Sequence, residues 1–174
     1  MPLRALVLIG FLAAASPATA GNAKCIWDQL PGSNRDAYLL AGLKDHRPDL
    51  VDHFSDAQLS VGLNACKISD AAMEHAGRAF SGYTGQLVAE RRLEILTNVY
   101  PKQLDAAWAV LDPGVIAALA QEVASGTDTG AGRKVWNSLI ATLTPAASDL
   151  AALKLELISY MSSRATRQAN EKLY

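Results

Sequence analysis

The chain has 174 residues, half of them hydrophobic, and a formal net charge of −1 at pH 7. This size suits one domain around one core. The near-neutral charge and the scattered basic residues exclude the clustered basic surface that nucleic acid or an anionic membrane requires, so neither is an expected partner.

The first 20 residues have the three parts of a cleaved secretory signal peptide. A positively charged start precedes an apolar run over residues 5–15, and the segment ends in the small-x-small pattern Ala18-Thr19-Ala20. The apolar run is too short for a transmembrane helix, which needs about 20 apolar residues. We therefore expect a mature chain over residues 21–174, located in the periplasm or secreted, without integral membrane association.

Export would place the two cysteines of the chain in an oxidising compartment. Cys25 and Cys66 lie 41 positions apart (66 − 25), and no C-x-x-C spacing or cysteine–histidine cluster accompanies them. A structural disulfide is therefore favoured over a redox or metal site. Closing a loop of about 40 residues stabilises a fold by roughly 4 kcal/mol in the chain-entropy account of disulfides.

One tryptophan near the start of the mature chain lies outside any apolar periodicity. Trp27 follows Cys25 by two residues. A disulfide at Cys25 would pull the indole onto the body of the domain, which favours core packing over an exposed binding anchor. The next helix is expected to start at Ser33, with Asp36 three residues later in a capping-box pattern.

Residues 45–56 hold the densest group of candidate functional side chains. If a helical turn starts there, acids and histidines at i, i+4 spacing can converge on a divalent cation such as zinc, copper or nickel. The candidate ligands are His46, Asp49, Asp52 and His53. Aspartates are equally favoured at helix N-termini, where they cap backbone N–H groups and interact with the helix dipole. Capping is the favoured interpretation, and a metal site is the alternative.

A long amphipathic helix is expected over about 70–98, after a shorter helix that Ser55 can cap. Its apolar residues recur at spacings of three and four and form one stripe. The stripe contains Met73, Ala76, Phe80, Tyr83 and Leu87. His75 borders this stripe and is expected to hydrogen-bond a neighbouring backbone group at the edge of the core.

Asp112 followed by Pro113 is typical of a helix N-cap and first turn, and it separates two short helices. Residues 125–132 lack periodicity and are expected to form a flexible loop. A second long helix is expected over about 146–170. Its stripe contains Leu143, Ala146, Leu150, Leu153, Leu157 and Tyr160. We expect the two stripes to face each other, and residues 162–174 to fray.

These patterns predict an all-α, single-domain helical bundle of about six or seven helices, two of them long, with one disulfide. The densest basic residues are expected on solvated helix faces. They are Arg91, Arg92, Arg164 and Arg167.

The sequence contains no nucleophile-elbow, zinc-protease or haem-attachment motif. The leading hypothesis is therefore a non-enzymatic periplasmic module that binds another protein or a small apolar ligand and needs no cofactor. The alternative is a metal-binding protein or metal-dependent enzyme that uses the Asp/His cluster at 45–56. Loss of a stoichiometric metal in a variant with both His46 and His53 replaced would support the alternative.

Overall fold

The computed structural model describes residues 22–143 and 150–174. The predicted signal peptide and its cleavage site lie outside the described residues, as does the predicted start of the second long helix. The described residues form eight α-helices and two short 3-10 helices, and they contain no strand. The prediction of an all-α bundle is confirmed.

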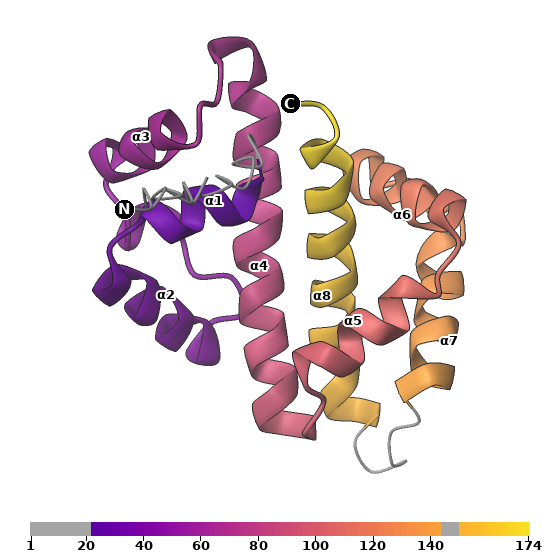
Figure 1. Cartoon of the computed structure of the whole chain (residues 1–174). Coiled ribbons are helices and arrows are strands. Elements are labelled where there is room, and N and C mark those ends of the chain that lie inside the picture. The colour runs from indigo at the N-terminus through magenta and orange to yellow at the C-terminus, as the bar shows by residue number, and fades with distance from the viewer. Residues whose placement is uncertain (1–21, 144–149) are drawn as a thin grey trace, which may run out of the picture.

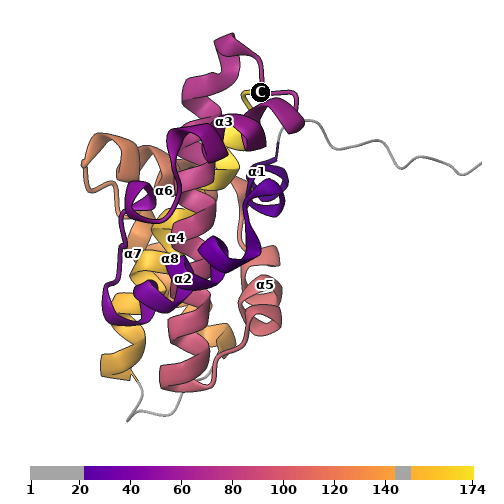
Figure 2. The ribbon, with the colours of Figure 1, turned by 90° about the vertical axis from the view of Figure 1, so that its left-hand side faces the viewer.

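Two long antiparallel helices form the centre of the molecule. The α-helices are α1 (Ala23–Gln29), α2 (Gly32–Lys44), α3 (Asp56–Ala65), α4 (Met73–Thr97), α5 (Pro101–Ala109), α6 (Pro113–Ser125), α7 (Ala131–Leu143) and α8 (Leu150–Glu171). The 3-10 helices are η1 (Leu50–Asp52) and η2 (Asp70–Ala72). Helices α4 and α8 lie side by side, with α1–α3 on one side and α5–α7 on the other (Figure 1). Figure 2 shows α2 and α3 in front of α4.

Two hydrophobic clusters flank this central pair. The N-terminal cluster joins α1–α3 to α4 and includes Ile26, Trp27, Tyr38, Phe54, Phe80 and Tyr83. The C-terminal cluster joins α5–α7 to α8 and includes Leu104, Trp108, Leu119, Val135, Leu139, Leu153, Leu157 and Tyr160. The expectation that the two long stripes face each other is therefore wrong. Helix α4 buries two faces: Phe80, Tyr83 and Leu87 of the predicted stripe belong to the N-terminal cluster. Ala89 and Leu93 of the same helix belong to the C-terminal cluster.

Trp27 lies at the centre of the N-terminal cluster and is 6% exposed. Its ring contacts the rings of Tyr38, Phe54, Phe80 and Tyr83, with centroid distances between 5.9 and 6.5 Å. Three of these contacts are edge-on, a favourable geometry for aromatic pairs. The prediction of a core role for Trp27 is confirmed. Met73, predicted to be in the same stripe, is 39% exposed because it is the first residue of α4.

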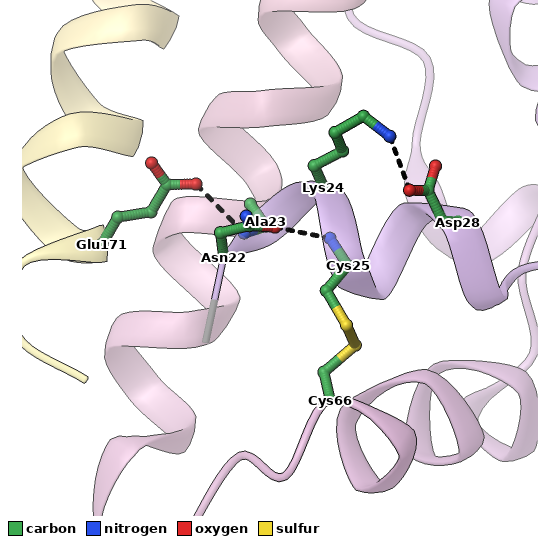
Figure 3. Close-up of a disulfide and its surroundings, with 7 residues drawn as sticks. All are labelled: Asn22, Ala23, Lys24, Cys25, Asp28, Cys66 and Glu171. Carbon is green, nitrogen blue, oxygen red and sulfur yellow. Dashed lines mark hydrogen bonds and ion pairs between the residues drawn. A yellow bond between two sulfur atoms is a disulfide. The ribbon is translucent and has the colours of Figure 1, made fainter. Parts of the chain in front are cut away.

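The Cys25–Cys66 disulfide joins α1 to the end of α3, with a Cα–Cα distance of 5.9 Å (Figure 3). The start of α1 is also held by α8, because the backbone N–H of Ala23 donates to Oε1 of Glu171 over 3.0 Å. Asn22 caps the helix by accepting the Cys25 N–H. The N-terminal segment is thus attached covalently to one neighbour and by a hydrogen bond to another.

Helix starts follow the predicted capping patterns at two of three positions. Ser55 forms a capping box with Gln58, and Asp112 accepts the N–H groups of the first turn of α6. The capping box predicted at Ser33 is wrong. The N-cap of α2 is Pro31, two residues before Ser33, and its carbonyl accepts the first N–H groups of a helix that starts at Gly32.

The segment between α6 and α7 is attached to α6 by one carboxylate. Oε2 of Glu122 accepts the backbone N–H groups of Thr129, Ala131 and Gly132, and also the Thr129 hydroxyl. The Thr129 hydroxyl and these N–H groups hold the pKa of Glu122 below its usual value. Glu122 thereby supplies an acceptor at the start of α7. The flexibility predicted for residues 125–132 stays a prediction.

The segment predicted to fray, 162–174, is helical through Glu171. Arg164 and Ala165 are buried, and Tyr174 packs against the N-terminal cluster. Residues 162–174 make polar and aromatic contacts as well as apolar ones. This mixture explains why the segment has no simple apolar stripe in its sequence.

Close packing of α4 against α8 depends on two glycines. A Cβ added to Gly82 would lie 2.7 Å from two backbone atoms of α8, the amide nitrogen of Arg167 and the carbonyl oxygen of Ser163. A Cβ added to Gly85 would lie 2.6 Å from the Ser163 Oγ. The two backbones can approach this closely because neither glycine has a side chain.

We expect Gly82→Ala to lower the free energy of unfolding by about 1 to 3 kcal/mol, because the added methyl would push two helix backbones apart. Gly77→Ala in the same helix is the matched control, since nothing lies within 4 Å of its added Cβ. The free energy of unfolding of the control should rise by about 0.5 to 1 kcal/mol, because alanine has a higher helix propensity than glycine. Urea unfolding followed by circular dichroism measures both, and equal effects would contradict the close-packing explanation.

Among the described residues, no single helix has both the length and the apolarity of a membrane span. Helices α5 and α6 reach that composition only when taken together, and they meet at a bend of 111°. The disulfide is compatible with an extracellular protein.

Candidate functional site

A cleft of about 320 Å³ opens where the segment after α2 meets α4 and α8. We call it the hydroxyl cleft, because seven of the side chains that line it carry hydroxyl groups. They are Tyr38, Ser81, Thr84, Ser159, Ser162, Ser163 and Thr166. The other lining residues used below are His46, Arg47, Asp49, Gly82, Gly85 and Val123. The cleft is thus rich in hydroxyl groups and has few charges.

Helical spacing brings these hydroxyl groups together. Ser159, Ser162, Ser163 and Thr166 follow one another at steps of three, one and three residues, so they share one face of α8. Ser81 and Thr84 occupy α4 beside the two close-packed glycines. The small residues at this crossing leave space that larger side chains would fill.

Tyr38 reaches the cleft from α2 and is 3% exposed. Burial raises the pKa of Tyr38, although a hydrogen bond with the Thr84 side chain opposes the increase. The Thr84 hydroxyl in turn donates to the Ser81 carbonyl over 3.1 Å. The buried side of the cleft is therefore a connected set of neutral polar groups.

A buried ionic cluster supports the wall of the cleft at His46. Glu156 of α8 has a side chain only 4% exposed, and its Oε1 lies 2.9 Å from Arg92 Nε and 3.2 Å from His46 Nδ1. These two contacts are electrostatic, because their angles depart from hydrogen-bond geometry. The other ring nitrogen, His46 Nε2, lies 3.3 Å from Arg92 Nη2 in a hydrogen bond. Both ring nitrogens of His46 thus have partners.

Arg92 also fixes the end of α2. Its Nη1 donates to the Leu43 and Gly42 carbonyls over 2.5 and 3.2 Å. A cation at these last carbonyls is favourable, because a helix C-terminus carries partial negative charge. Arg92 therefore connects α2, α4 and α8 and positions the segment that carries His46.

The prediction that the four densest arginines are solvated is correct only for Arg91, whose side chain is 51% exposed. The side chains of Arg92, Arg164 and Arg167 are 12%, 10% and 19% exposed. All three lie on helix faces that another helix covers, and each has a carboxylate partner. Paired charges of this kind are the usual way for an arginine to be buried.

The predicted metal ligands are only partly brought together. His46 and Asp49 both line the hydroxyl cleft, while Asp52 and His53 do not. Asp49 caps η1 by accepting the Val51 N–H, which matches the capping interpretation. The His53 ring packs edge-on against Tyr38, with centroids 5.5 Å apart. In the part of the chain that the structure describes, no group of three or more His, Cys, Asp or Glu side chains is arranged to hold a metal ion.

His75, expected beside the core, is half-buried, and its Nδ1 lies 3.1 Å from Oδ1 of Asn170. Its partner is thus a side chain of α8 instead of the expected backbone group.

A second polar network lies between α4, α5 and α8. Arg164 binds Asp105 over 2.5 Å, contacts the Tyr160 hydroxyl, and stacks over the Trp108 ring at 5.2 Å. Burial raises the pKa of Glu90 in this network; a hydrogen bond from Gln86 is the first of the effects that oppose the increase. The network is structural in character, because its ionic groups contact one another and no described cleft opens onto Glu90.

We expect Glu90→Gln to stabilise the protein at pH 7. The folded-state pKa of Glu90 is raised, so folding favours its protonated form and the ionised form costs stability above that pKa. The gain should shrink as the pH falls through the raised folded-state pKa and disappear below the ordinary glutamate pKa, where the folded and unfolded states are both protonated. Denaturant unfolding of wild type and variant at a series of pH values measures this. Glu94→Gln, one helical turn away, is the control, and a gain independent of pH would contradict the interpretation.

Comparison of the chain with protein-family models, with curated proteins and with solved structures finds no match. The functional inference therefore depends on the geometry of the site.

Proposed function

We propose that the protein is a non-enzymatic binding module, exported from the cytoplasm, that holds a small uncharged polar ligand in the hydroxyl cleft. The observation that carries this proposal is the set of seven hydroxyl-bearing side chains around one cleft of about 320 Å³. This volume is at the lower end of the range for small-molecule sites, about 300 to 1,000 Å³. Export is supported by the signal-peptide pattern at residues 1–20 and by the disulfide.

The chemistry of the lining favours a ligand that has hydroxyl groups of its own. A hydroxyl group both donates and accepts hydrogen bonds, so a wall of hydroxyls matches a polyol or a small saccharide at several positions. Arg47 and Asp49 at the edge of the cleft carry opposite charges, so they do not favour an ionic ligand of either sign. The polar lining supports a different ligand from the small apolar molecule expected from the sequence.

The surroundings of His46 support binding over catalysis. A serine nucleophile needs a neighbouring base with a free nitrogen. Nδ1 of His46 faces Glu156, and its Nε2 accepts from Arg92, so neither nitrogen is free to take a proton from a serine hydroxyl. The histidine therefore acts as a support for the wall of the cleft.

Nuclear magnetic resonance titration of the mature protein with glycerol, myo-inositol and glucose tests the proposal. At least one of these probes should shift the backbone resonances of cleft residues, and the shift should disappear in Ser81→Trp, which fills the mouth of the cleft. Ser60→Trp on the exposed face of α3 is the matched control and should bind as wild type does. Absence of cleft shifts with all three probes would contradict the proposal.

A parallel titration with zinc tests the metal-binding alternative. Stoichiometric zinc binding that is lost when His46 and His53 are both replaced by alanine would favour the alternative over the proposed function. Weak zinc binding that is unchanged by the double substitution would leave the proposed function in place.

A further inference from the structure

We propose that a second site on the molecule, a groove between α6 and the C-terminal half of α8, binds an unbranched amphiphile with a carboxylate head group, such as a medium-chain fatty acid. The groove has a volume of about 710 Å³, and His75 and Arg78 of α4 form part of its edge. We call it the alanine groove. This inference does not depend on the function proposed for the hydroxyl cleft.

The floor of the alanine groove is apolar and made mainly of small residues. It consists of Ile116, Ala117, Ala120, Val123, Ala124, Ala165, Ala169 and Leu173. Alanine side chains are too short to fill the space between two helices, so an open apolar channel remains. Apolar surface of this kind is favourably covered by an alkyl chain, because each methylene removed from water contributes to binding.

The ions at the edge of the groove are both cations. Arg78 and Lys172 line it beside the ring of His75, and no aspartate or glutamate does. Arg78 pairs with Glu74, but both side chains are more than half exposed, and such pairs are weak in water. Lys172 has no ion pair among the described residues. The charges around the groove therefore complement a carboxylate.

The acid next to Lys172 in the chain, Glu171, does not line the groove, although it borders a small neighbouring pocket. Glu171 accepts the Ala23 N–H and lies 3.6 Å from Arg167 (Figure 3 shows the first contact). Its negative charge is therefore already paired with groups of α1 and α8. Together with the apolar floor, this leaves a site with an apolar channel and a cationic end, which is the chemistry that recognises a fatty-acid anion.

Isothermal titration of the mature protein with decanoate, decanol and decyltrimethylammonium, each below its micellar concentration, tests the inference. Decanoate should bind at least tenfold more tightly than the other two, because only its head group complements Arg78 and Lys172. Within a series from octanoate to dodecanoate, each added methylene should tighten the Kd by up to about fourfold. Equal binding of decanoate and decanol would overturn the inference.

Two kinds of variant locate the site. Replacing Arg78 and Lys172 together by alanine should weaken decanoate binding at least tenfold and leave decanol unchanged, whereas Lys102→Ala on α5 should have no effect. Ala120→Trp should block the channel for both compounds. If this variant does not fold, the charge variants still decide the question, because they change exposed side chains only. Unchanged decanoate binding in the double variant would overturn the inference.

The cleft-filling variant Ser81→Trp separates this inference from the proposed function. Decanoate binding that persists in Ser81→Trp supports a separate site in the alanine groove. Decanoate binding that is lost in Ser81→Trp would place the amphiphile in the hydroxyl cleft and would contradict both proposals. If an acidic amphipathic peptide binds the alanine groove and decanoate does not, the partner is a protein and not a fatty acid. That result would overturn the inference.

Discussion

Glu156→Ala is expected to lower the free energy of unfolding by about 3 to 5 kcal/mol, a large part of the stability of a domain of this size. The substitution leaves the buried Arg92 guanidinium without its negative partner, while His46 loses the carboxylate that faces Nδ1. Removing one member of a buried ion pair costs more than the pair itself contributes, because the remaining charge stays out of water without compensation. Guanidinium chloride unfolding followed by circular dichroism measures the loss.

The exposed pair Arg91–Glu94 gives the matched control. Glu94→Ala removes a carboxylate from a partner that is 51% exposed, so the cost should be below about 1 kcal/mol. The double variant Arg92→Met/Glu156→Leu should recover part of the stability lost in Glu156→Ala, because apolar residues of similar size often replace a buried ion pair without penalty. The recovery stays partial because the Leu43 and Gly42 carbonyls lose the Arg92 donor. A loss for Glu156→Ala no larger than that for Glu94→Ala would show that water screens this cluster.

The helices and the disulfide were predictable because their signals are local or few. Burial along one side of a helix imposes apolar spacings of three and four, which identify both long helices. Two cysteines allow only one intramolecular pair, so the expectation of an oxidising compartment was enough to predict the Cys25–Cys66 disulfide. Capping residues such as Ser55 and Asp112 act within three positions of themselves and are therefore readable without tertiary structure.

The orientation of the stripes was not predictable in the same way. The large apolar residues of α4 mark one buried face, but they do not say which neighbour covers it. The second buried face carries Gly82, Gln86, Ala89 and Leu93, of which only Leu93 is a large apolar residue, so it gives a weak apolar signal. Two glycines three residues apart inside a long helix were the available sign of close contact with another helix, because a glycine there is otherwise unfavourable.

The candidate site required contacts between distant segments. Arg92 precedes the buried Leu93, and Glu156 precedes the buried Leu157, so each charge is next to a core position. That placement was the signal that sequence reasoning missed, whereas their pairing with His46 depends on how α2, α4 and α8 pack. The hydroxyl cleft likewise draws its lining from five segments, and serine residues that are unremarkable in sequence become a site only where those segments meet.

The second large effect is expected for Phe80→Ala, which should lower the free energy of unfolding by about 3 to 5 kcal/mol. Phe80 is 5% exposed and belongs to the N-terminal cluster, where its ring lies 6.5 Å from that of Trp27. The Trp27 ring belongs to α1, which the disulfide joins to the end of α3, so the space left by the phenyl group cannot close easily. A cavity that stays open costs contacts in addition to the lost burial.

Ile95→Ala is the control for Phe80→Ala, since Ile95 is a large apolar residue of the same helix that is 51% exposed. Its removal should change stability by less than about 1 kcal/mol, because little of its surface is withdrawn from water. Both variants are compared by urea unfolding, with tryptophan fluorescence as a second probe because Trp27 borders the cavity. If Phe80→Ala costs no more than Ile95→Ala, the aromatic cluster rearranges to fill the space, and the packing of α1–α3 on α4 is looser than the ring contacts imply.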